Sequence, residues 1–221
     1  MIISHGRKFI FVHVPKTGGT ALSLALEDRA MADDILIGDT PKAVKRRKRF
    51  KPLIAEHRLS KHSKLSDMQA VLSPQELASY FKFTLVRNPW DWAVSYYHWL
   101  QMQTWDHHAV TAAKSLSFDA FLRDPVIARG LAMPYGQYLA HRDGQEMGAH
   151  FFRLERLDEE LAPLWDHLGF DLGPIARKNA SERARDFRRY YSDADRDLVA
   201  QLCAVDIARF GYAFTETGLR S

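Results

Sequence analysis

The sequence is short of cysteine and of long apolar stretches. Cys203 is its only cysteine, and no run of 18 or more apolar residues occurs. A lone thiol cannot form an internal disulfide, and its place in an amphipathic helical pattern favours a buried structural thiol. No span is long enough for a transmembrane helix, and the first eight residues lack the apolar core and cleavage site of a signal peptide. We therefore expect a cytoplasmic protein, because that compartment keeps thiols reduced.

Internal repeats and low-complexity linkers are also missing, which argues against solenoids and tethered modules. The chain has 221 residues, of which 46% are hydrophobic and 12% aromatic. A chain of this length buries roughly 70% of its unfolded surface around one core. We therefore expect a single domain over residues 1–221.

Acidic residues are absent from one decapeptide, residues 42–51. It contains seven bases, so the net charge of +4 becomes 4 − 7 = −3 for the rest of the chain. This local patch, rather than a global attraction to nucleic acid, needs an explanation. Two interpretations stay open: a solvated loop or exposed helix, and a contact for an anionic substrate. The seven bases are Lys42, Lys45, Arg46, Arg47, Lys48, Arg49 and Lys51.

A glycine-rich turn lies between a predicted strand and a predicted helix near the N-terminus. Residues 9–14 are almost wholly apolar, as in a strand covered on both faces, and residues 21–26 are strong helix formers. Glycines let a backbone approach a ligand, and amides at a helix start favour phosphate or sulfate. We expect an anion site here, with a simple tight turn as the alternative. Its candidate residues are Lys16, Thr17, Gly18, Gly19 and Thr20.

A second strand-turn-helix unit follows. A capping box at Ser73 predicts a helix over residues 74–79, residues 81–86 read as a strand, and residues 92–103 resume a helix. Two such units predict an α/β fold with a central parallel sheet flanked by helices, and a ligand site at the carboxyl ends of the strands. Arg87, after the strand, and Ser95, in the helix, suit a phosphate clamp. In the alternative, Arg87 pairs with Asp91 and Ser95 fills a helix face.

The remaining elements are predicted from shorter patterns. We expect a polar loop over residues 56–64 and a mobile or substrate-facing segment over residues 131–142. A short strand or a return loop is predicted at residues 35–39, and a short strand at residues 151–154. Helices are predicted after Thr40 and over residues 117–122, 157–168 and 181–189, with a long last helix capped by Ser192.

A Walker A sequence is also missing. That motif places lysine after the glycines, whereas Lys16 precedes Gly18 and Gly19. The inversion disfavours ATP chemistry. Residues 15–20, together with residues 87–91 and Ser95, instead resemble the two nucleotide motifs of the sulfotransferase family that uses 3'-phosphoadenosine 5'-phosphosulfate (PAPS), and above all its carbohydrate-type branch. Weaker similarity covers residues 153–157, 179–181, 190–192 and 206–212.

The resemblance implies a P-loop NTPase-like sulfotransferase fold and a role for each motif. Residues 16–20 match the loop that binds the 5'-phosphosulfate, with Lys16 assisting departure of the bridging oxygen. Arg87 and Ser95 match the residues that hold the 3'-phosphate. Two departures are Trp92, where arginine is common, and Ala21, where serine is common.

Sulfuryl transfer to an alcohol needs a base, and histidine is the usual candidate because its pKa lies near working pH. His62 matches the region in which relatives place a histidine, and we favour it over His57, although either fits a surface position. No metal is required, and the pair His107 and His108 lacks the companions of a metal site. We expect His13 to pack at the strand end.

The sequence thus predicts a sulfotransferase whose acceptor bears a hydroxyl group and is most simply a carbohydrate. A nucleotide kinase or other P-loop NTPase, and a non-catalytic protein that binds nucleotide or polyanion, are the alternatives. Lys178, Asn179 and Ser181 either close over the nucleotide or cap a helix. Trp90, Trp92, Tyr96, Tyr97, Trp99 and Trp105 form either a stacking wall for the acceptor or part of the core.

Overall fold

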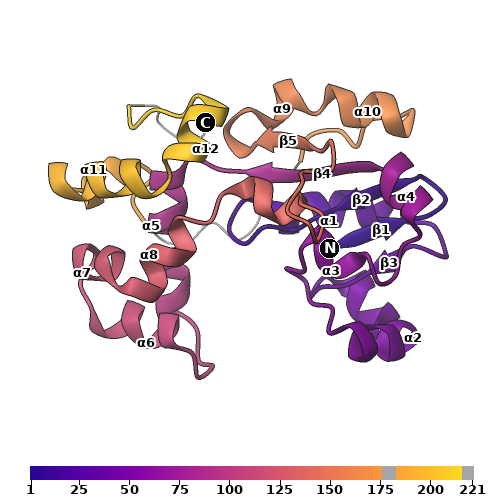
Figure 1. Ribbon diagram of the computed structural model, residues 1–221, viewed down its shortest axis with the longest axis horizontal. Coiled ribbons are helices and arrows are strands. Elements are labelled where there is room, and N and C mark those ends of the chain that lie inside the picture. Colours follow the sequence, from indigo (N-terminus) through magenta and orange to yellow (C-terminus); the bar gives the residue numbers. More distant parts are fainter. Residues whose placement is uncertain (176–182, 216–221) are drawn as a thin grey trace. The chain divides into compact units, whose positions relative to one another are not determined.

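Figure 1 shows the computed structural model, which describes residues 1–175 and 183–215. Contacts between Cα atoms divide the chain into two compact units. Unit 1 comprises Met1–Val86, Tyr135–Phe152 and Arg156–Lys178, and unit 2 comprises Arg87–Pro134, Arg153–Glu155 and Asn179–Ser221. The loop at residues 15–20 belongs to unit 1, and Arg87 belongs to unit 2. The single domain over residues 1–221 stays a prediction.

The five-stranded sheet confirms the predicted α/β class. Its order is β3-β1-β2-β4-β5, and β2 and β4 are parallel, with Phe9 opposite Phe81. β1 is antiparallel to β2 and β3, so the sheet is mixed around a parallel core. The reason is local, because the four residues between β1 and β2 can only return the chain antiparallel. The strands are β1 (Ile2–Ser4), β2 (Phe9–Phe11), β3 (Ile35–Leu36), β4 (Phe81–Val86) and β5 (His150–Arg153).

Helices make up most of the remaining structure. In unit 1 they are α1 (Gly19–Asp28), α2 (Pro41–His57), α3 (Leu65–Met68), α4 (Pro74–Ser79), α9 (Leu157–Glu160) and α10 (Ala162–Leu168), with the 3₁₀ turn η1 (Tyr135–Leu139). In unit 2 they are α5 (Pro89–Gln101), α6 (His108–Ser115), α7 (Phe118–Arg123), α8 (Pro125–Leu131), α11 (Asp193–Leu202) and α12 (Ala204–Phe210), with η3 (Phe187–Tyr190). The 3₁₀ turn η2 (Leu154–Arg156) spans the boundary between the units.

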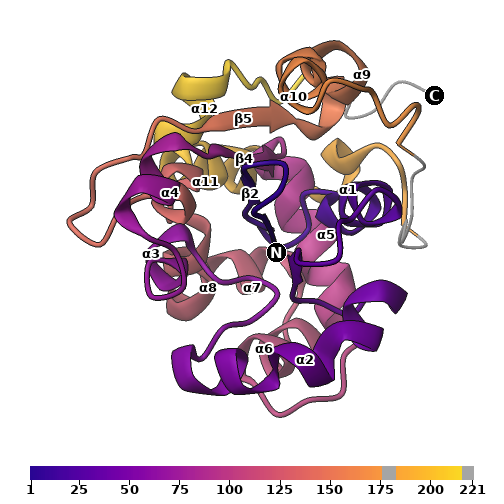
Figure 2. The ribbon, with the colours of Figure 1, turned by 90° about the vertical axis from the view of Figure 1, so that its right-hand side faces the viewer.

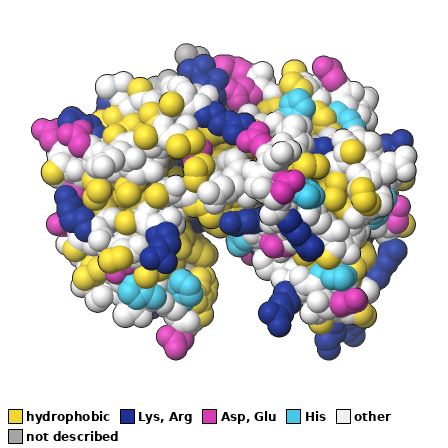
Figure 3. All heavy atoms as spheres, viewed as in Figure 1, with side chains coloured by type: hydrophobic (Ala, Val, Ile, Leu, Met, Phe, Trp, Pro, Cys, Tyr) yellow, Lys and Arg dark blue, Asp and Glu magenta, His cyan; other side chains and the backbone are white. Residues whose placement is uncertain are grey.

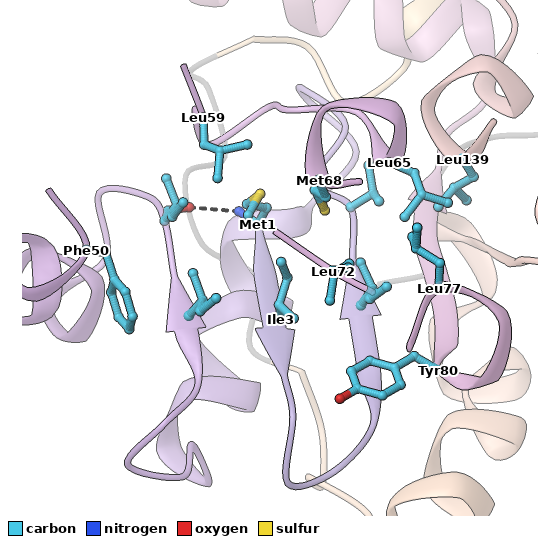
Figure 4. Packing of buried hydrophobic residues seen from close by; sticks show 14 residues of the cluster. Met1, Ile3, Phe50, Leu59, Leu65, Met68, Leu72, Leu77, Tyr80 and Leu139 are labelled. Atoms are coloured by element: carbon cyan, nitrogen blue, oxygen red, sulfur yellow. Dashed lines mark hydrogen bonds between the residues drawn. The ribbon is translucent and has the colours of Figure 1, made fainter. Parts of the chain in front are cut away.

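Both faces of the unit 1 sheet are covered by helices. Successive strand residues point to opposite faces, so neighbouring residues pack in different clusters. Ile3 and Ile10 pack in one cluster with α3, α4 and Phe50 of α2. Their neighbours Ile2 and Phe11 pack in a second cluster with α1 and α10. Figure 2 shows α3 and α4 on one side of β2 and α1 on the other. Figure 4 shows the first cluster, where the nitrogen of Met1 donates to the oxygen of Ile37 at 2.8 Å.

Several predicted helix boundaries differ from the structure. Glu56 and His57 lie in the last turn of α2 rather than in a loop. The helix after Arg87 begins at Pro89 rather than Trp92, because the side chain of Asn88 accepts from the amide of Trp90. The predicted helix over residues 157–168 is broken into α9 and α10, and residues 131–142 include the end of α8 and η1. Of residues 181–189, the first two lie outside the described residues and Phe187 begins a 3₁₀ turn.

Unit 2 is organised around α5, which packs against α6, α7, α11 and η3. Trp90 and Tyr97 of α5 are buried. Cys203, between α11 and α12, is also buried, and its thiol donates to the oxygen of Leu131 at 3.4 Å. Burial, followed by the nearby charge of Asp206, raises the pKa of Cys203 to about 12. The prediction of a buried structural thiol is confirmed. Across residues 1–175 and 183–215, no helix is long and apolar enough to cross a bilayer.

Candidate functional site

The loop at residues 15–20 reverses the chain between β2 and α1. Lys16 has φ 61° and Gly18, the N-cap of α1, has φ 83°. Both lie in the left-handed region, which costs little for glycine and about 1 kcal/mol for lysine. The hydroxyl of Thr17 is buried and donates to the oxygen of Val14 at 2.9 Å, which closes the turn. The loop therefore brings Lys16 and the first amides of α1 to the carboxyl end of β2, as an anion site requires.

His13 explains why glycine occupies position 19. A Cβ atom built on Gly19 would lie 2.4 Å from Cδ2 and 2.6 Å from Nε2 of the His13 ring. Any larger residue would displace either the ring or the loop. His13 is only 3% exposed, and its Nδ1 is buried without a hydrogen-bond partner in the described part of the chain. Burial, with nearby cations second, holds the pKa of His13 well below its usual value, so the ring is neutral and supports the loop by shape.

His62 lies against the same ring, and its protonation state follows from its contacts. Its Nδ1 is 2.8 Å from the main-chain oxygen of His13, and the two rings meet edge to face at 5.0 Å. A carbonyl oxygen only accepts, so Nδ1 carries the proton and Nε2 keeps its lone pair. Burial, partly offset by this hydrogen bond, lowers the pKa of His62, and the charge of Lys61 lowers it further. The result is a neutral imidazole with a basic nitrogen, next to the loop.

Lys61 connects this histidine segment directly to the loop. Its Nζ lies 3.2 Å from Oγ1 of Thr20 and 2.7 Å from Oδ1 of Asp39. The hydrogen bond and charge of Lys61 help to hold the pKa of Asp39 below its usual value, against the opposing effect of desolvation. The hydroxyl of Thr20 and a second ammonium group thus lie together. No hydrogen bond or ion pair among the described residues joins His57 to the loop; His57 instead pairs with Glu56 at 3.8 Å.

The second motif forms a buried charge cluster in unit 2. Arg87 donates from Nε and Nη2 to Oδ2 of Asp91, at 2.9 and 2.7 Å. The guanidinium of Arg183 bonds the other oxygen of Asp91. All three side chains are less than a tenth exposed, and the cluster carries a net charge of +1. A net positive charge and guanidinium groups held in place by a carboxylate are features that an anion site needs.

Ser95 lies one turn after Asp91 on α5 and is 5% exposed. Residues one turn apart share a helix face, so Ser95 is on the same side of α5 as the charge cluster. The pairing of Arg87 with Asp91, which the sequence left open as an alternative, is therefore present. This pairing uses two of the five N–H donors of the Arg87 guanidinium, so it does not exclude a phosphate. Binding of a phosphate by Arg87 and Ser95 stays a prediction.

Glu155 holds the start of the second motif in place. One carboxylate oxygen accepts from the amide of Asn88 at 2.7 Å, and the other accepts from the hydroxyl of Tyr212 at 3.3 Å. Burial raises the pKa of Glu155. These contacts join residues from three of the segments in which the sequence resembles the sulfotransferase family.

The sequence did not single out Lys61, Asp39, Asp91 or Arg183 as site residues. Lys61 is adjacent to His62, and Asp91 is one turn from Arg87. Their positions in the sequence could therefore have identified both as site residues. Arg183 lies 92 residues from Asp91, and no local pattern joins them. The strands that precede the two motifs, β2 and β4, are parallel neighbours within unit 1.

Other predicted positions have simpler roles. His107 caps α6 by accepting from the amide of Ala109, and His108 pairs with Asp124. Of the six predicted aromatics, Trp90 and Tyr97 are core residues, whereas Trp105 is 46% exposed. Within residues 1–175 and 183–215, no group of three or more His, Cys, Asp or Glu residues is arranged to hold a metal ion. Lys178, Asn179 and Ser181 lie outside the described residues.

A family model matches nearly the whole chain, and a solved structure shares its fold. The model of the sulfotransferase family matches residues 1–213. Curated protein sequences give no match. Among solved structures, the chain is similar to mouse sulfotransferase SULT7A1 complexed with PAP, with a TM-score of 0.53 and 19% identity over 93% of this chain and 85% of that one. At this identity the likeness concerns the fold, and it confirms the fold predicted from the sequence.

Proposed function

This chain belongs to the sulfotransferase family of enzymes, and we propose that it transfers a sulfuryl group from PAPS to a hydroxyl group of a carbohydrate. The observation that carries the proposal is the placement of His62. Its neutral imidazole, with Nε2 as acceptor, is held by the residue that also supports Gly19. The buried residue His13 therefore contacts both the candidate base and the candidate anion loop.

The loop fits the 5' end of the donor. Gly19 lets the loop pack closely against the His13 ring, and the first amides of α1 suit a doubly charged oxyanion. Lys16 would neutralise the charge that develops on the 5'-phosphate as the bond between sulfur and its bridging oxygen breaks. Thr17 is committed to the oxygen of Val14 through its hydroxyl, so its contribution to the anion would be its amide. Thr20 would offer its hydroxyl, next to Lys61.

When bound, PAPS supplies the activated sulfuryl group. In our proposal, Nε2 of His62 accepts the proton of the acceptor hydroxyl as that oxygen forms its bond to sulfur. The hydrogen bond from Nδ1 to the oxygen of His13 stabilises the imidazolium that results. Lys61 opposes that charge, so His62 returns its proton readily after transfer.

In the same proposal, Arg87 and Ser95 bind the 3'-phosphate that distinguishes this donor from ATP. Asp91 orients the guanidinium of Arg87 by accepting from its Nε and Nη2. PAP, the ligand of the mouse structure, is the nucleotide that remains after sulfuryl transfer and carries both phosphates. Because the chain matches the model of the sulfotransferase family, ATP chemistry is the weaker candidate.

Titration calorimetry tests the donor. PAP should bind without magnesium and in the presence of EDTA, and more tightly than Mg-ATP. Lys16→Ala should lower kcat for transfer by roughly 100-fold or more, whereas Lys114→Ala, which removes an exposed lysine from α6, should match the wild type. Tighter binding of Mg-ATP would favour the NTPase alternative. Unchanged function in Lys16→Ala would favour a non-catalytic protein.

The carbohydrate acceptor and the cytoplasmic location are further parts of the proposal. The resemblance to the carbohydrate-type branch supports the first. The buried free thiol of Cys203, which suits a reducing compartment, supports the second. Transfer of labelled sulfuryl groups to sugars but not to phenols would support a carbohydrate acceptor. Fractionation of expressing cells would test the location.

A further inference from the structure

Three lysines form a row along the outward face of α2. Lys45, Lys48 and Lys51 are three residues apart, and all three are exposed. Neighbours at this spacing lie on successive turns, about 4.5 Å apart along the helix axis. Figure 3 shows basic side chains at the lower right, where Figure 1 places α2.

The other four bases of the decapeptide have a structural role. Their side chains donate to main-chain oxygens of the segment that precedes α2. Arg46 bonds the oxygens of Met31 and Asp34, at 2.8 and 3.1 Å. The remaining bonds join Lys42 to Glu27, Arg47 to Gly38 and Arg49 to Ala32. The structure thus separates the basic stretch into four bases that tie α2 to residues 27–38 and a row of three that does not.

The row is electrostatically unfavourable for the helix itself. Like charges on adjacent turns of a helix repel each other. The first turn of α2 has no acid, and the first acid of the helix is Glu56. Within the described part of the chain, no salt bridge engages Lys45, Lys48 or Lys51. The three lysines therefore do not stabilise α2, and an anionic partner would explain their presence.

The position of α2 connects the row to the loop at residues 15–20. The salt bridge between Asp39 and Lys61 joins the two ends of the segment that contains α2. Lys61 also contacts Thr20 of the loop. The three lysines span about 9 Å along the axis of α2, so a ligand that contacts all three needs several negative charges in succession.

We propose that the row of Lys45, Lys48 and Lys51 docks a polyanionic glycan, a carbohydrate chain with carboxylate or sulfate groups, of which one hydroxyl is the acceptor. This inference rests on the proposed function. The apolar face of α2, with Ala43 and Phe50, is buried in the core, so α2 has no face to insert into a membrane. Phe50 is the only aromatic residue of α2, so the row offers no ring on which a nucleic-acid base would stack.

Binding to matched polymers tests the proposal. The probes are dextran sulfate, polygalacturonate, uncharged dextran of the same chain length, a single-stranded dT oligonucleotide and phosphatidylserine vesicles. The variant K45Q/K48Q/K51Q is compared with K114Q/R129Q/R189Q, which removes the same charge from exposed residues of unit 2. We expect the wild type to prefer dextran sulfate and polygalacturonate over dextran. The α2 variant should lose at least tenfold in affinity for both, and the control less than twofold.

Equal losses in the two variants, or none in the α2 variant, would overturn the proposal. Tighter binding of the oligonucleotide or of the vesicles than of dextran sulfate at equal salt would overturn it in favour of those partners. PAP titration of the same variants separates this result from the proposed function. If PAP fails to bind the wild type, the proposed function fails. If PAP binds the wild type and both variants equally, and K45Q/K48Q/K51Q also leaves polymer affinity unchanged, then the docking surface is wrong and the proposed function stands.

Discussion

His62 donates from Nδ1 to the main-chain oxygen of His13 at 2.8 Å, and this one contact sets which nitrogen of His62 can act as a base. Because a main-chain oxygen is the acceptor, substitution of the His13 side chain leaves the bond in place. The base and its support are therefore separable by mutation.

Transfer should depend on pH through His62. Burial, and then Lys61, lower its pKa below 6.5, and only the neutral form accepts a proton. We expect kcat/KM to rise with pH and to reach half its maximum below pH 6.5. Lys61→Ala removes one cause of the lowering, so the half-point should move to higher pH. His62→Gln should lower kcat by about 100-fold or more and leave PAP affinity within twofold. A half-point that Lys61→Ala leaves in place would contradict this assignment.

Gly19→Ala should damage the loop through a steric contact with His13. The new Cβ would lie within 3 Å of three ring atoms, so the loop or the ring must move. We expect PAP affinity to fall at least tenfold. The double variant Gly19→Ala with His13→Ala should regain most of the affinity, because the ring is then absent. Equal affinities in the single and double variants would mean that the ring is not the obstacle. Gly130→Ala is the control, since a Cβ added at Gly130 would meet no atom within 4 Å.

Arg87 should discriminate PAP from AMP. If it binds the 3'-phosphate, Arg87→Ala loses a charge-assisted hydrogen bond, and PAP affinity should fall by roughly 10- to 100-fold. AMP affinity should be unchanged. Arg87→Lys should not restore binding, because lysine cannot reproduce the two bonds to Asp91. Equal losses for PAP and AMP would assign Arg87 to structure alone.

The same substitution has a cost in stability that must be measured separately. Removing one partner of a buried ion pair costs about 3 to 5 kcal/mol. Arg183 continues to bond Asp91, so the loss in Arg87→Ala should lie at the lower end. Arg123→Ala is the matched control, because it breaks an ion pair with Asp195 in which the arginine is 46% exposed. Thermal unfolding of the two variants gives the comparison.

Cys203 should resist alkylation in the folded protein. Its pKa of about 12 lies above the usual value of 9, so the folded state favours the thiol over the reactive thiolate. The stabilising effect is complete below pH 9 and is lost as the pH rises through 12. We expect the melting temperature of the wild type to fall more between about pH 8 and 11 than that of Cys203→Ala. Rapid labelling by iodoacetamide at about pH 8 without denaturant would show that the thiol is accessible.

Local patterns predicted the elements whose causes are local. The capping box at Ser73 predicted α4 with the bounds that the structure has, because the serine hydroxyl and the Glu76 carboxylate satisfy amides within the same turn. The strand at residues 81–86 was also correct, since its aromatic and β-branched residues face a core on both sides. The turn at residues 15–20 followed from its glycines and from the apolar strand before it.

Contacts between distant segments were beyond such patterns. The pairing of β3 with β1 places Leu36 opposite Ile2, although the two residues are far apart in the sequence. The second arginine on Asp91 comes from a segment 92 residues away. The basic stretch illustrates the same limit. Its charge was evident, but only the hydrogen bonds of Arg46 and its neighbours separate the bases that hold α2 from those that face outward.

The sheet order also has a consequence for the sequence of folding events. β1 and β2 are joined by four residues, so their hairpin forms from local contacts, on a timescale of microseconds. The parallel pairing of β2 with β4 joins Phe9 to Phe81, across roughly 70 residues of chain, and must wait for that loop to close. The strand that leads into Lys16 is therefore ordered early, and the strand that leads into Arg87 reaches it late. Substitutions in the β1–β2 hairpin should therefore slow refolding more than equally destabilising ones at the β2–β4 contact between Phe11 and Phe83, which should mainly speed unfolding.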